Sequence, residues 1–254
     1  MISTSFSALF DLARVQQLLD EATGTGVKVG VLDTGVDSRH PALEGCLRAS
    51  FEIAHDGEGG AEVRRLVDGR DPVAHGTACA GIIHKIAPKA DLFSVEVMNP
   101  NQRNSPEKLI AGLQLALDEG WDVINLSAGL GRFDLGVFEV LEDAFYKNVI
   151  VVVAKSNEPD QIGYPAKTSN VIAVDMEHFE NPLGLTYRSG ERVEIEANGI
   201  YIEAPVPDGE FRSFTGTSFA CPNVSGIAAR LREAIPNLTP FQFRTILAEL
   251  GKPA

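Results

Sequence analysis

Small and apolar residues dominate the stretch Phe214-Thr-Gly-Thr-Ser-Phe-Ala-Cys-Pro-Asn-Val-Ser-Gly-Ile-Ala-Ala229, which predicts a helix buried in the core. Ser218 lies where this helix begins. Backbone N–H groups at a helix N-terminus are free to bind developing negative charge, so a hydroxyl there could belong to a reactive site. The simpler interpretation is that Thr217 or Ser218 only caps the helix. The stretch taken alone favours capping.

Outside this stretch, short apolar segments alternate with amphipathic ones. Strands are predicted for residues 27–32, 91–97, 122–126, 149–154, 171–174 and 193–197. Helices are predicted over residues 9–20, from His75, from Pro106, over residues 137–145, and from Pro240 behind the capping box of Thr239 and Gln242. Residues 44–73 predict a long loop that could contain a hairpin. Because strands and helices alternate with short connections, we expect one α/β domain over residues 1–254, with a mostly parallel sheet.

The composition narrows the classes of partner. The chain has 254 residues and a formal net charge of −13, which argues against binding to nucleic acid phosphates. This charge favours cationic or neutral substrates, although a merely soluble surface explains it better. No apolar run approaches the roughly 20 residues of a membrane span, and residues 1–20 lack the pattern of a signal peptide. Three cysteines without metal-ligand spacing favour reduced thiols and a cytoplasmic location.

Polar residues that could perform chemistry follow the predicted strands or begin the predicted helices. Asp33, Ser127 and Asn157 each follow a strand, and the carboxyl ends of parallel strands share one rim of a sheet. His75 and Ser218 each begin a helix of small residues. A nucleophilic serine needs a base to take its proton and a carboxylate to orient that base. The chain order aspartate, histidine, serine is one of three in which such groups occur.

Three blocks around these residues, at positions 31–41, 75–81 and 216–226, closely resemble the catalytic blocks of subtilisin-like serine peptidases. Residues 122–129 are similar to the substrate-binding strand of that family, and residues 151–157 with 163–166 to its oxyanion-hole segment. The resemblance extends from about residue 27 to residue 250. It implies a subtilisin-like three-layer α/β/α sandwich that hydrolyses peptide bonds in a peptide or protein substrate.

The resemblance also implies a role for each matched position. Ser218 would attack the scissile carbonyl, His75 would act as general base and then acid, and Asp33 would orient His75. The oxyanion would be held by the side-chain amide of Asn157 and the backbone N–H of Ser218. The substrate backbone would pair with Ser127, Ala128 and Gly129. The pocket for the residue before the cut would be walled by Ala154, Lys155, Ser156 and Gly163. The resemblance implies no cofactor and no catalytic metal.

The chain departs from the family pattern in several places. Ala78 and Asn223 stand where the family usually has histidines outside the triad. Lys155-Ser156 replaces a small-Gly pair, so we expect a narrower pocket or a cation near it. Cys221 is taken to occupy the position of a threonine that often supports the oxyanion hole, which would weaken that support. Ala42 replaces a calcium-binding aspartate, and the connection at residues 82–88 is too short for the usual calcium loop. We therefore expect the principal calcium site to be absent.

Other interpretations of these residues stay open. Asp33-Thr-Gly also occurs in aspartic peptidases, which need a second such motif that this chain lacks unless it dimerises. Asn157 could be a turn residue, and Cys79 could be a second nucleophile, although small core is the better reading. Asp33, Asp37 and His40 could bind a metal, but a turn acid and a surface histidine are the better interpretation. Selection of basic side chains is likewise the weaker interpretation of three acids that could simply be solvated loop residues, Asp68, Asp71 and Glu158. The leading hypothesis is a cytoplasmic serine endopeptidase. A peptide-binding pseudoprotease is the alternative.

Overall fold

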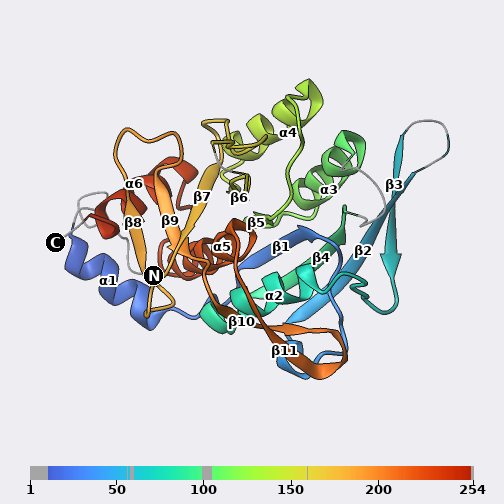
Figure 1. Ribbon diagram of the computed structural model, residues 1–254, viewed down its shortest axis with the longest axis horizontal. Helices are drawn as coiled ribbons and strands as arrows, with labels where there is room; N and C mark the ends of the chain where they lie inside the picture. The colour runs from blue at the N-terminus through green and yellow to red at the C-terminus, as the bar shows by residue number, and fades with distance from the viewer. Residues whose placement is uncertain (1–10, 56, 58–59, 99–104, 159, 253–254) are drawn as a thin grey trace.

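A twisted nine-stranded sheet forms the centre of the computed structural model, which describes residues 11–55, 57, 60–98, 105–158 and 160–252 (Figure 1). The strand order is β3-β2-β4-β1-β5-β6-β7-β9-β8, and all neighbours are parallel except the two edge pairs, β2 with β3 and β8 with β9. The strands span β1 Lys28–Asp33, β2 Leu47–His55, β3 Ala61–Leu66, β4 Asp91–Glu96, β5 Val123–Leu126, β6 Ile150–Ala154, β7 Ile172–Glu177, β8 Leu185–Tyr187 and β9 Ile195–Asn198.

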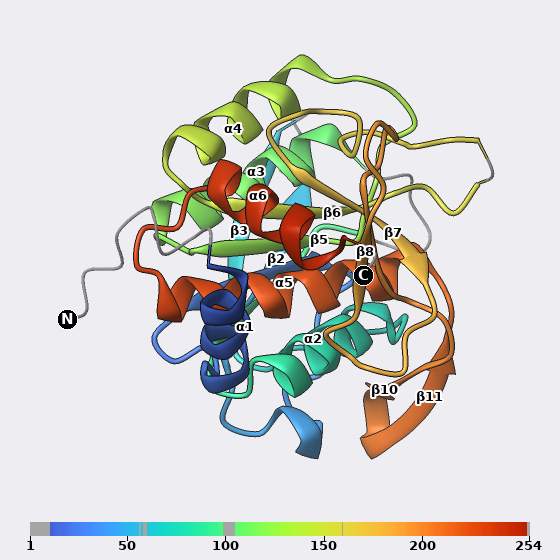
Figure 2. The same ribbon diagram turned by 90° about the vertical axis from the view of Figure 1, so that its left-hand side faces the viewer.

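Helices cover both faces of this sheet, which gives three layers, α/β/α, as expected (Figures 1 and 2). One core cluster joins the sheet to α1 (Leu12–Glu21), α2 (His75–Ile86), α5 (Thr217–Ala234) and α6 (Pro240–Leu250). A second cluster joins the opposite face to α3 (Pro106–Asp118) and α4 (Leu135–Tyr146). The central strands are buried on both faces, and their aliphatic sequences provide the apolar surface that this needs.

The stretch around Ser218 is the buried helix that its composition predicts. Small residues let α5 approach its neighbours closely: a Cβ atom added at Gly226 would lie 2.7 Å from the Cβ atom of Ile86 in α2. The far end of α5 is held by charged side chains. Arg230 donates to the carbonyl oxygens of Leu19 and Ile86, at the C-terminal ends of α1 and α2. Glu233 accepts hydrogen bonds from the three backbone N–H groups of residues 23–25.

The structure adds elements that the sequence pattern did not predict. The short helix η2 (Pro41–Leu43) precedes residues 44–73. Within those residues, the antiparallel strands β2 and β3 form the hairpin that the sequence allowed for, and this hairpin widens the sheet. A separate two-stranded sheet pairs β10 (Ile202–Val206) with β11 (Glu210–Phe214) across the turn η3 (Pro207–Gly209). Strand β11 is exposed along most of its length, so its sequence carries no apolar alternation. Of the predicted helix at residues 9–20, the first two residues lie outside the described part, and α1 begins after Asp11, its N-cap.

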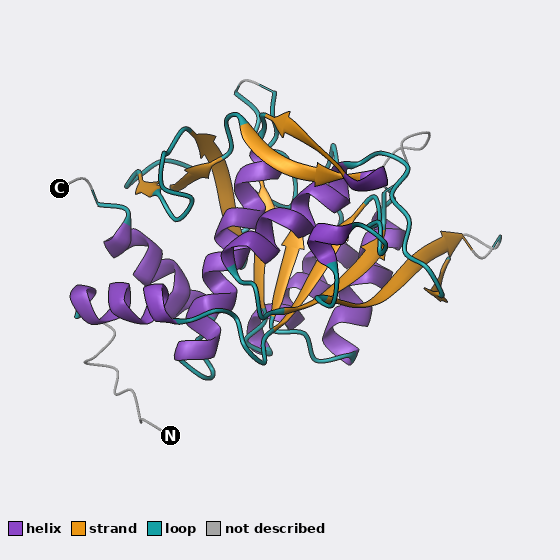
Figure 3. Ribbon diagram, turned by 90° about the horizontal axis from the view of Figure 1, so that it is seen from below, coloured by secondary structure: helices purple, strands orange, loops and turns teal. Residues whose placement is uncertain are grey.

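Seen from below, the hairpin of β10 and β11 lies across the helical layer that contains α2 (Figure 3). Pro205 of β10 approaches Gly81 of α2 so closely that a side chain at Gly81 would overlap the proline ring. None of the helices in the described ranges is both long enough and apolar enough to cross a membrane.

Removing divalent cations should leave the stability of the protein unchanged. Helix α2 runs without interruption to Ile86, and only residues 87–90 connect it to β4, so no loop is inserted there to surround an ion. Calcium needs six to eight oxygen ligands, which this connection is too short to supply. We expect the same melting temperature, followed by circular dichroism, with and without a calcium chelator. A fall of several degrees in chelator, reversed by added calcium, would contradict this expectation.

Replacing Gly30 by alanine should destabilise the fold by about 1–3 kcal/mol. Gly30 lies in β1, and a methyl group there would overlap the ring of Trp121, which is almost completely buried beside Phe93. The free energy of unfolding, measured by urea denaturation, reports the cost. Gly131→Ala is the matched control because its added methyl group meets no atom within 4 Å. Equal stability of the two variants would contradict the packing argument.

Candidate active site

Asp33 and His75 meet where β1 ends and α2 begins. The two atoms His75 Nδ1 and Asp33 Oδ1 lie 2.7 Å apart, so the ring N–H donates to the carboxylate. Asp33 is completely buried, and its Oδ1 also accepts from the backbone N–H of Thr34. The Oδ2 atom of Asp33 has no hydrogen-bond partner among the described residues. This pairing fixes which ring nitrogen carries the proton and leaves Nε2 to face outward.

The carboxylate of Asp71 holds this junction together. Its Oδ1 accepts from the Thr34 hydroxyl and from the backbone N–H groups of Val73 and Ala74, and its Oδ2 accepts from the backbone and hydroxyl of Thr77. Asp71 is buried and therefore satisfies the free N–H groups at the start of α2, where the N-cap residue offers no side-chain bond. A residue named only as a weak candidate for substrate selection is thus a structural anchor.

Burial and the neighbouring carboxylate act in opposite directions on His75. Burial is the largest single influence and lowers the pKa of His75, but the charge of Asp33, the hydrogen bond to it and the contact with Cys79 together raise this pKa further than burial lowers it. The net effect is a pKa above the ordinary histidine value. The ring is thereby made a stronger base than a free imidazole.

Cys79 lies one helical turn beyond His75 and contacts the same groups. Its Sγ is 4.0 Å from His75 Nδ1 and 3.4 Å from the carbonyl oxygen of Ser218. Burial raises the pKa of Cys79 to about 11, so the thiol is protonated at neutral pH. A buried, protonated thiol is a poor nucleophile, which favours the interpretation of Cys79 as core.

Metal ligands are grouped in one place within the described ranges, at Asp33, His75 and Cys79, whose ligand atoms lie within 4.8 Å of one another. A metal ion there would have to displace the proton that His75 shares with Asp33. The other proposed group does not form: Asp37 accepts from the backbone of Arg39, and His40 binds the backbone of Ala42 and Glu210. Metal ligation by Asp33, Asp37 and His40, already the weaker interpretation from the sequence, therefore has no support in the structure.

Ser218 is the second residue of α5, and the capping interpretation of this position is wrong. The N-cap is Gly216, and no side chain caps the helix. The Thr217 hydroxyl instead donates to the carbonyl oxygen of Lys155. In the described part of the chain, the backbone N–H of Ser218 has no hydrogen-bond acceptor, so it remains available to a ligand.

The side chain of Asn157 is oriented by Thr217. Its Oδ1 accepts from the Thr217 backbone N–H at 3.0 Å and lies 3.1 Å from the Thr217 hydroxyl oxygen, whose proton goes to the carbonyl oxygen of Lys155. Because an N–H group can bond only to an acceptor, the oxygen of the amide is fixed on this side, and the NH₂ group is left for the cavity. Cys221, which was expected to stand in for a supporting threonine, points instead toward the carbonyl oxygen of Leu126. The threonine that contacts the Asn157 side chain is Thr217.

A chain of buried hydrogen bonds fixes the first turn of α5 on the end of β5. The Ser225 hydroxyl donates to Asn125 Oδ1, Asn125 Nδ2 donates to the Ser127 hydroxyl, and Ser127 donates to the Ser218 carbonyl oxygen. Asn125 and Ser225 are completely buried. Every member of the chain is both positioned and satisfied, which rigidifies the contact.

His75 and Ser218 lie in one neighbourhood without a hydrogen bond between them. The His75 ring is 5.2 Å from the ring of Phe219, the residue after Ser218, and Cys79 contacts both His75 and Ser218. Across the described residues, no hydrogen bond joins His75 to the Ser218 hydroxyl. Such bonds between reacting groups are often long in proteins without substrate and shorten when it binds.

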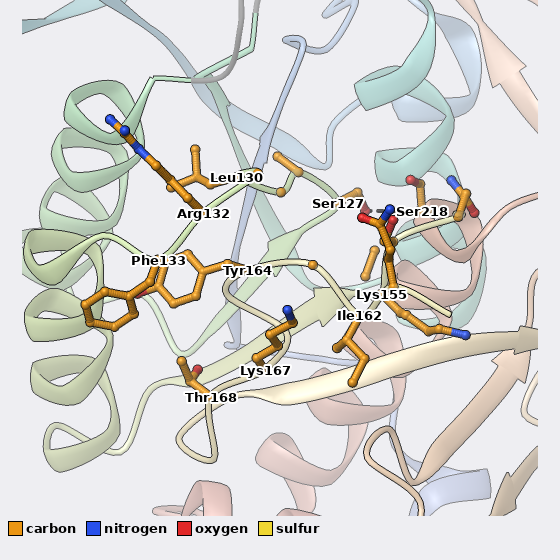
Figure 4. A pocket seen from close by; sticks show the side chains of 18 residues that line it. Ser127, Leu130, Arg132, Phe133, Lys155, Ile162, Tyr164, Lys167, Thr168 and Ser218 are labelled. Carbon is orange, nitrogen blue, oxygen red and sulfur yellow. Dashed lines mark hydrogen bonds between the residues drawn. The ribbon is translucent and has the colours of Figure 1, made fainter. Parts of the chain in front are cut away.

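A cavity of about 570 Å³ opens beside Ser218 (Figure 4). It is lined by all the positions that the sequence resemblance gave for substrate binding, namely Ser127, Ala128, Gly129, Ala154, Lys155, Ser156 and Gly163, and by Asn157. The far wall comes from residues that sequence reasoning did not name, Leu130, Phe133, Tyr164 and Lys167 among them. Leu130 and Tyr164 exchange backbone hydrogen bonds, which join the two walls.

Two interpretations of the charge near the cavity are not supported by the structure. The Lys155 ammonium forms an ion pair with Asp175 at 2.6 Å and points away from the cavity, so it neither narrows the cavity nor charges it (Figure 4). Asp68, Asp71 and Glu158 are absent from the described lining, so selection of basic side chains by these acids is unsupported.

The two positions that lack the family's histidines have structural roles. Ala78 is completely buried in α2, in a cluster with Ala204 of β10 and Phe219 of α5. The side-chain amide of Asn223 donates to the carbonyl oxygens of Asn198 and Phe219, which ties α5 to the end of β9.

Comparison with known proteins identifies relatives of this arrangement. The family model Peptidase_S8, described as the Subtilase family, matches residues 24–249. An intracellular serine protease of Paenibacillus polymyxa is 29% identical over 238 residues, which cover 88% of this chain and 72% of the relative. Subtilisin E of Bacillus subtilis is 31% identical over 236 residues, which cover 87% of this chain and 59% of the relative, so the chain spans less than two thirds of that protein.

Solved structures share the fold. The crystal structure of a cold adapted subtilisin-like serine proteinase superposes with a TM-score of 0.74 at 25% sequence identity, over 90% of this chain and 83% of the other. The agreement confirms the three-layer α/β/α arrangement expected from the sequence.

Removing the negative charge beside His75 should lower the pKa of that histidine. In Asp33→Asn the attraction that overcomes burial is lost, so His75 should become neutral at a lower pH than in the wild type. NMR titration of the imidazole resonances measures this directly and needs no assay of function. Asp37→Asn is the matched control, since Asp37 lies in the loop that follows β1 and accepts from the backbone of Arg39 instead. An unchanged titration in Asp33→Asn would contradict the electrostatic argument.

Proposed function

Because this chain belongs to the subtilase family of serine peptidases, we propose that it is a serine endopeptidase that cleaves peptide bonds through Asp33, His75 and Ser218. The observation that carries the proposal is the Asp33–His75 hydrogen bond, located beside a helix N-terminus that presents Ser218 to a cavity. We also propose that residues 1–254 act as one peptidase domain. A single sheet that draws strands from residue 28 to residue 198 supports this.

In the proposed reaction, Ser218 Oγ attacks the scissile carbonyl carbon while His75 Nε2 takes the hydroxyl proton. Asp33 keeps the proton of His75 on Nδ1 and stabilises the imidazolium that forms. The tetrahedral intermediate collapses when His75 gives its proton to the leaving amine, which leaves an acyl group on Ser218. Water, activated by His75 in the same way, then releases the acyl product and restores the hydroxyl.

Two donors would stabilise the oxyanion of the tetrahedral intermediate. The backbone N–H of Ser218 has no acceptor among the described residues, and the NH₂ group of Asn157 is turned away from Thr217. Donors that are held in place before the reaction cost no reorganisation when charge develops. Thr217 would therefore contribute to the rate by fixing Asn157, without contacting substrate itself.

The substrate would lie along residues 127–129 and place the side chain before the cut in the cavity walled by Ala154, Lys155, Ser156 and Gly163. The proposed partner is a peptide or protein, and no nucleic acid partner is proposed. The proposed reaction needs neither a cofactor nor a membrane. We propose a cytoplasmic location, which is supported by three free cysteines and by the likeness to an intracellular serine protease.

An active enzyme is favoured over a peptide-binding pseudoprotease. The alternative rested on Lys155, Ser156 and Cys221 as replacements that would impair the site. Lys155 is neutralised by Asp175, and Thr217 supplies the support that Cys221 was thought to lack. Two of the three replacements that motivated the pseudoprotease, Lys155 and Cys221, thus lose their argument.

A fluorophosphonate probe should label the wild-type protein at neutral pH, because it reacts with a serine whose hydroxyl is activated by a base. Ser218→Ala should abolish the labelling, and His75→Ala should reduce it to background. Ser213→Ala, on the exposed strand β11, is the control that should be labelled like the wild type. Absence of labelling in folded wild-type protein, together with tight peptide binding that His75→Ala leaves unchanged, would overturn the proposal in favour of the pseudoprotease.

A further inference from the structure

The cavity beside Ser218 has a charge opposite to that of the whole protein. The chain contains 35 acidic and 22 basic residues. The described lining of the cavity contains the three cationic residues Arg132, Lys155 and Lys167, and no aspartate or glutamate. A side chain that enters the cavity therefore meets a local environment that the net charge of −13 does not represent.

Only part of this positive charge is available to a ligand. Lys155 is paired with Asp175 and points out of the cavity. Within the described ranges, Lys167 and Arg132 have no carboxylate within ion-pair distance. Figure 4 shows the Lys167 side chain directed into the cavity between Tyr164 and Lys155, whereas Arg132 lies at the outer rim. Lys167 is therefore the free cation that a bound side chain would meet.

The walls around Lys167 suit a side chain with an apolar stem and a charged end. Leu130, Ile162 and Tyr164 line the cavity between Ser218 and the far wall. Leu130 and Tyr164 are buried, whereas Lys167 is itself exposed, so an ion pair with Lys167 would be partly screened by water. A charge close to Lys167 interacts with it more strongly than with remote groups. The acidic residues elsewhere on the surface repel a bound acidic side chain only weakly, because salt screens charges that lie far apart.

We propose that this cavity selects an acidic side chain, such as glutamate, at the residue before the scissile bond, with Lys167 as its charge partner. The proposal rests on the proposed peptidase function, because it assigns the cavity to the substrate. It reverses the expectation, drawn from net charge, that cationic or neutral substrates are preferred. In this proposal Lys167 determines the specificity of the cavity and takes no part in bond cleavage.

The test compares two fluorogenic peptides that differ only by glutamate or glutamine before the cut. These side chains have nearly the same shape, so the ratio of their kcat/KM values isolates the charge. We expect the wild type to prefer glutamate by about fivefold, the upper range for a partly exposed ion pair. Lys167→Gln should bring the ratio close to one. Lys147→Gln, which removes an exposed lysine at the end of α4 away from the cavity, should keep the wild-type ratio.

Binding to the Ser218→Ala variant provides a readout that does not depend on cleavage. Its affinity for the glutamate peptide should exceed that for the glutamine peptide, and the difference should shrink at high ionic strength. Equal affinities and equal kcat/KM values, or a preference that survives Lys167→Gln, would overturn the assignment. Absence of fluorophosphonate labelling would instead count against the peptidase function, and the binding comparison would still decide the role of Lys167.

Discussion

The buried carboxylate of Asp71 connects the end of β1 to the beginning of α2. It accepts five hydrogen bonds, from Thr34 on one side and from Val73, Ala74 and Thr77 on the other. Hydrogen bonds to a charged group are worth about 1.5–3 kcal/mol each, and a buried carboxylate left without them would cost more than it contributes. Because this junction fixes the end of β1 against the beginning of α2, Asp33 Oδ1 and His75 Nδ1 are held 2.7 Å apart. The proposed chemistry depends on that fixed geometry.

The sequence contained much of the fold and of the candidate site because both depend on local pattern. The aliphatic run of β6 and the small residues of α5 identify buried elements, and Asp33, His75 and Ser218 stand at element ends where the carboxyl-edge rule places a site. Short or exposed strands such as β8 and β11 carry little pattern, so they were not predicted.

Contacts between distant residues were beyond the reach of the sequence. Thr217 and Asn157 are 60 positions apart, so their hydrogen bonds are visible only in the fold, and the support first assigned to Cys221 was misplaced by a few residues. The direction of the Lys155 side chain depends on Asp175 of a neighbouring strand. Charge shows the same limit. The net charge describes the whole chain, whereas the described lining of the cavity contains basic residues and no acidic ones.

Helix α5 packs in the hydrophobic core and also carries Ser218 in its first turn. Gly226 packs against Ile86 two turns beyond Ser218, about 12 Å along the helix axis at 1.5 Å per residue, and Arg230 and Glu233 tether the end beyond it. The first turn of α5 is fixed as well, by the hydrogen bonds through Asn125 and Ser127, so the helix can move only together with the core around it. The nucleophile that we propose is therefore positioned by the hydrophobic core itself, so substitutions deep in the interior and far from the cavity would shift the Ser218 hydroxyl.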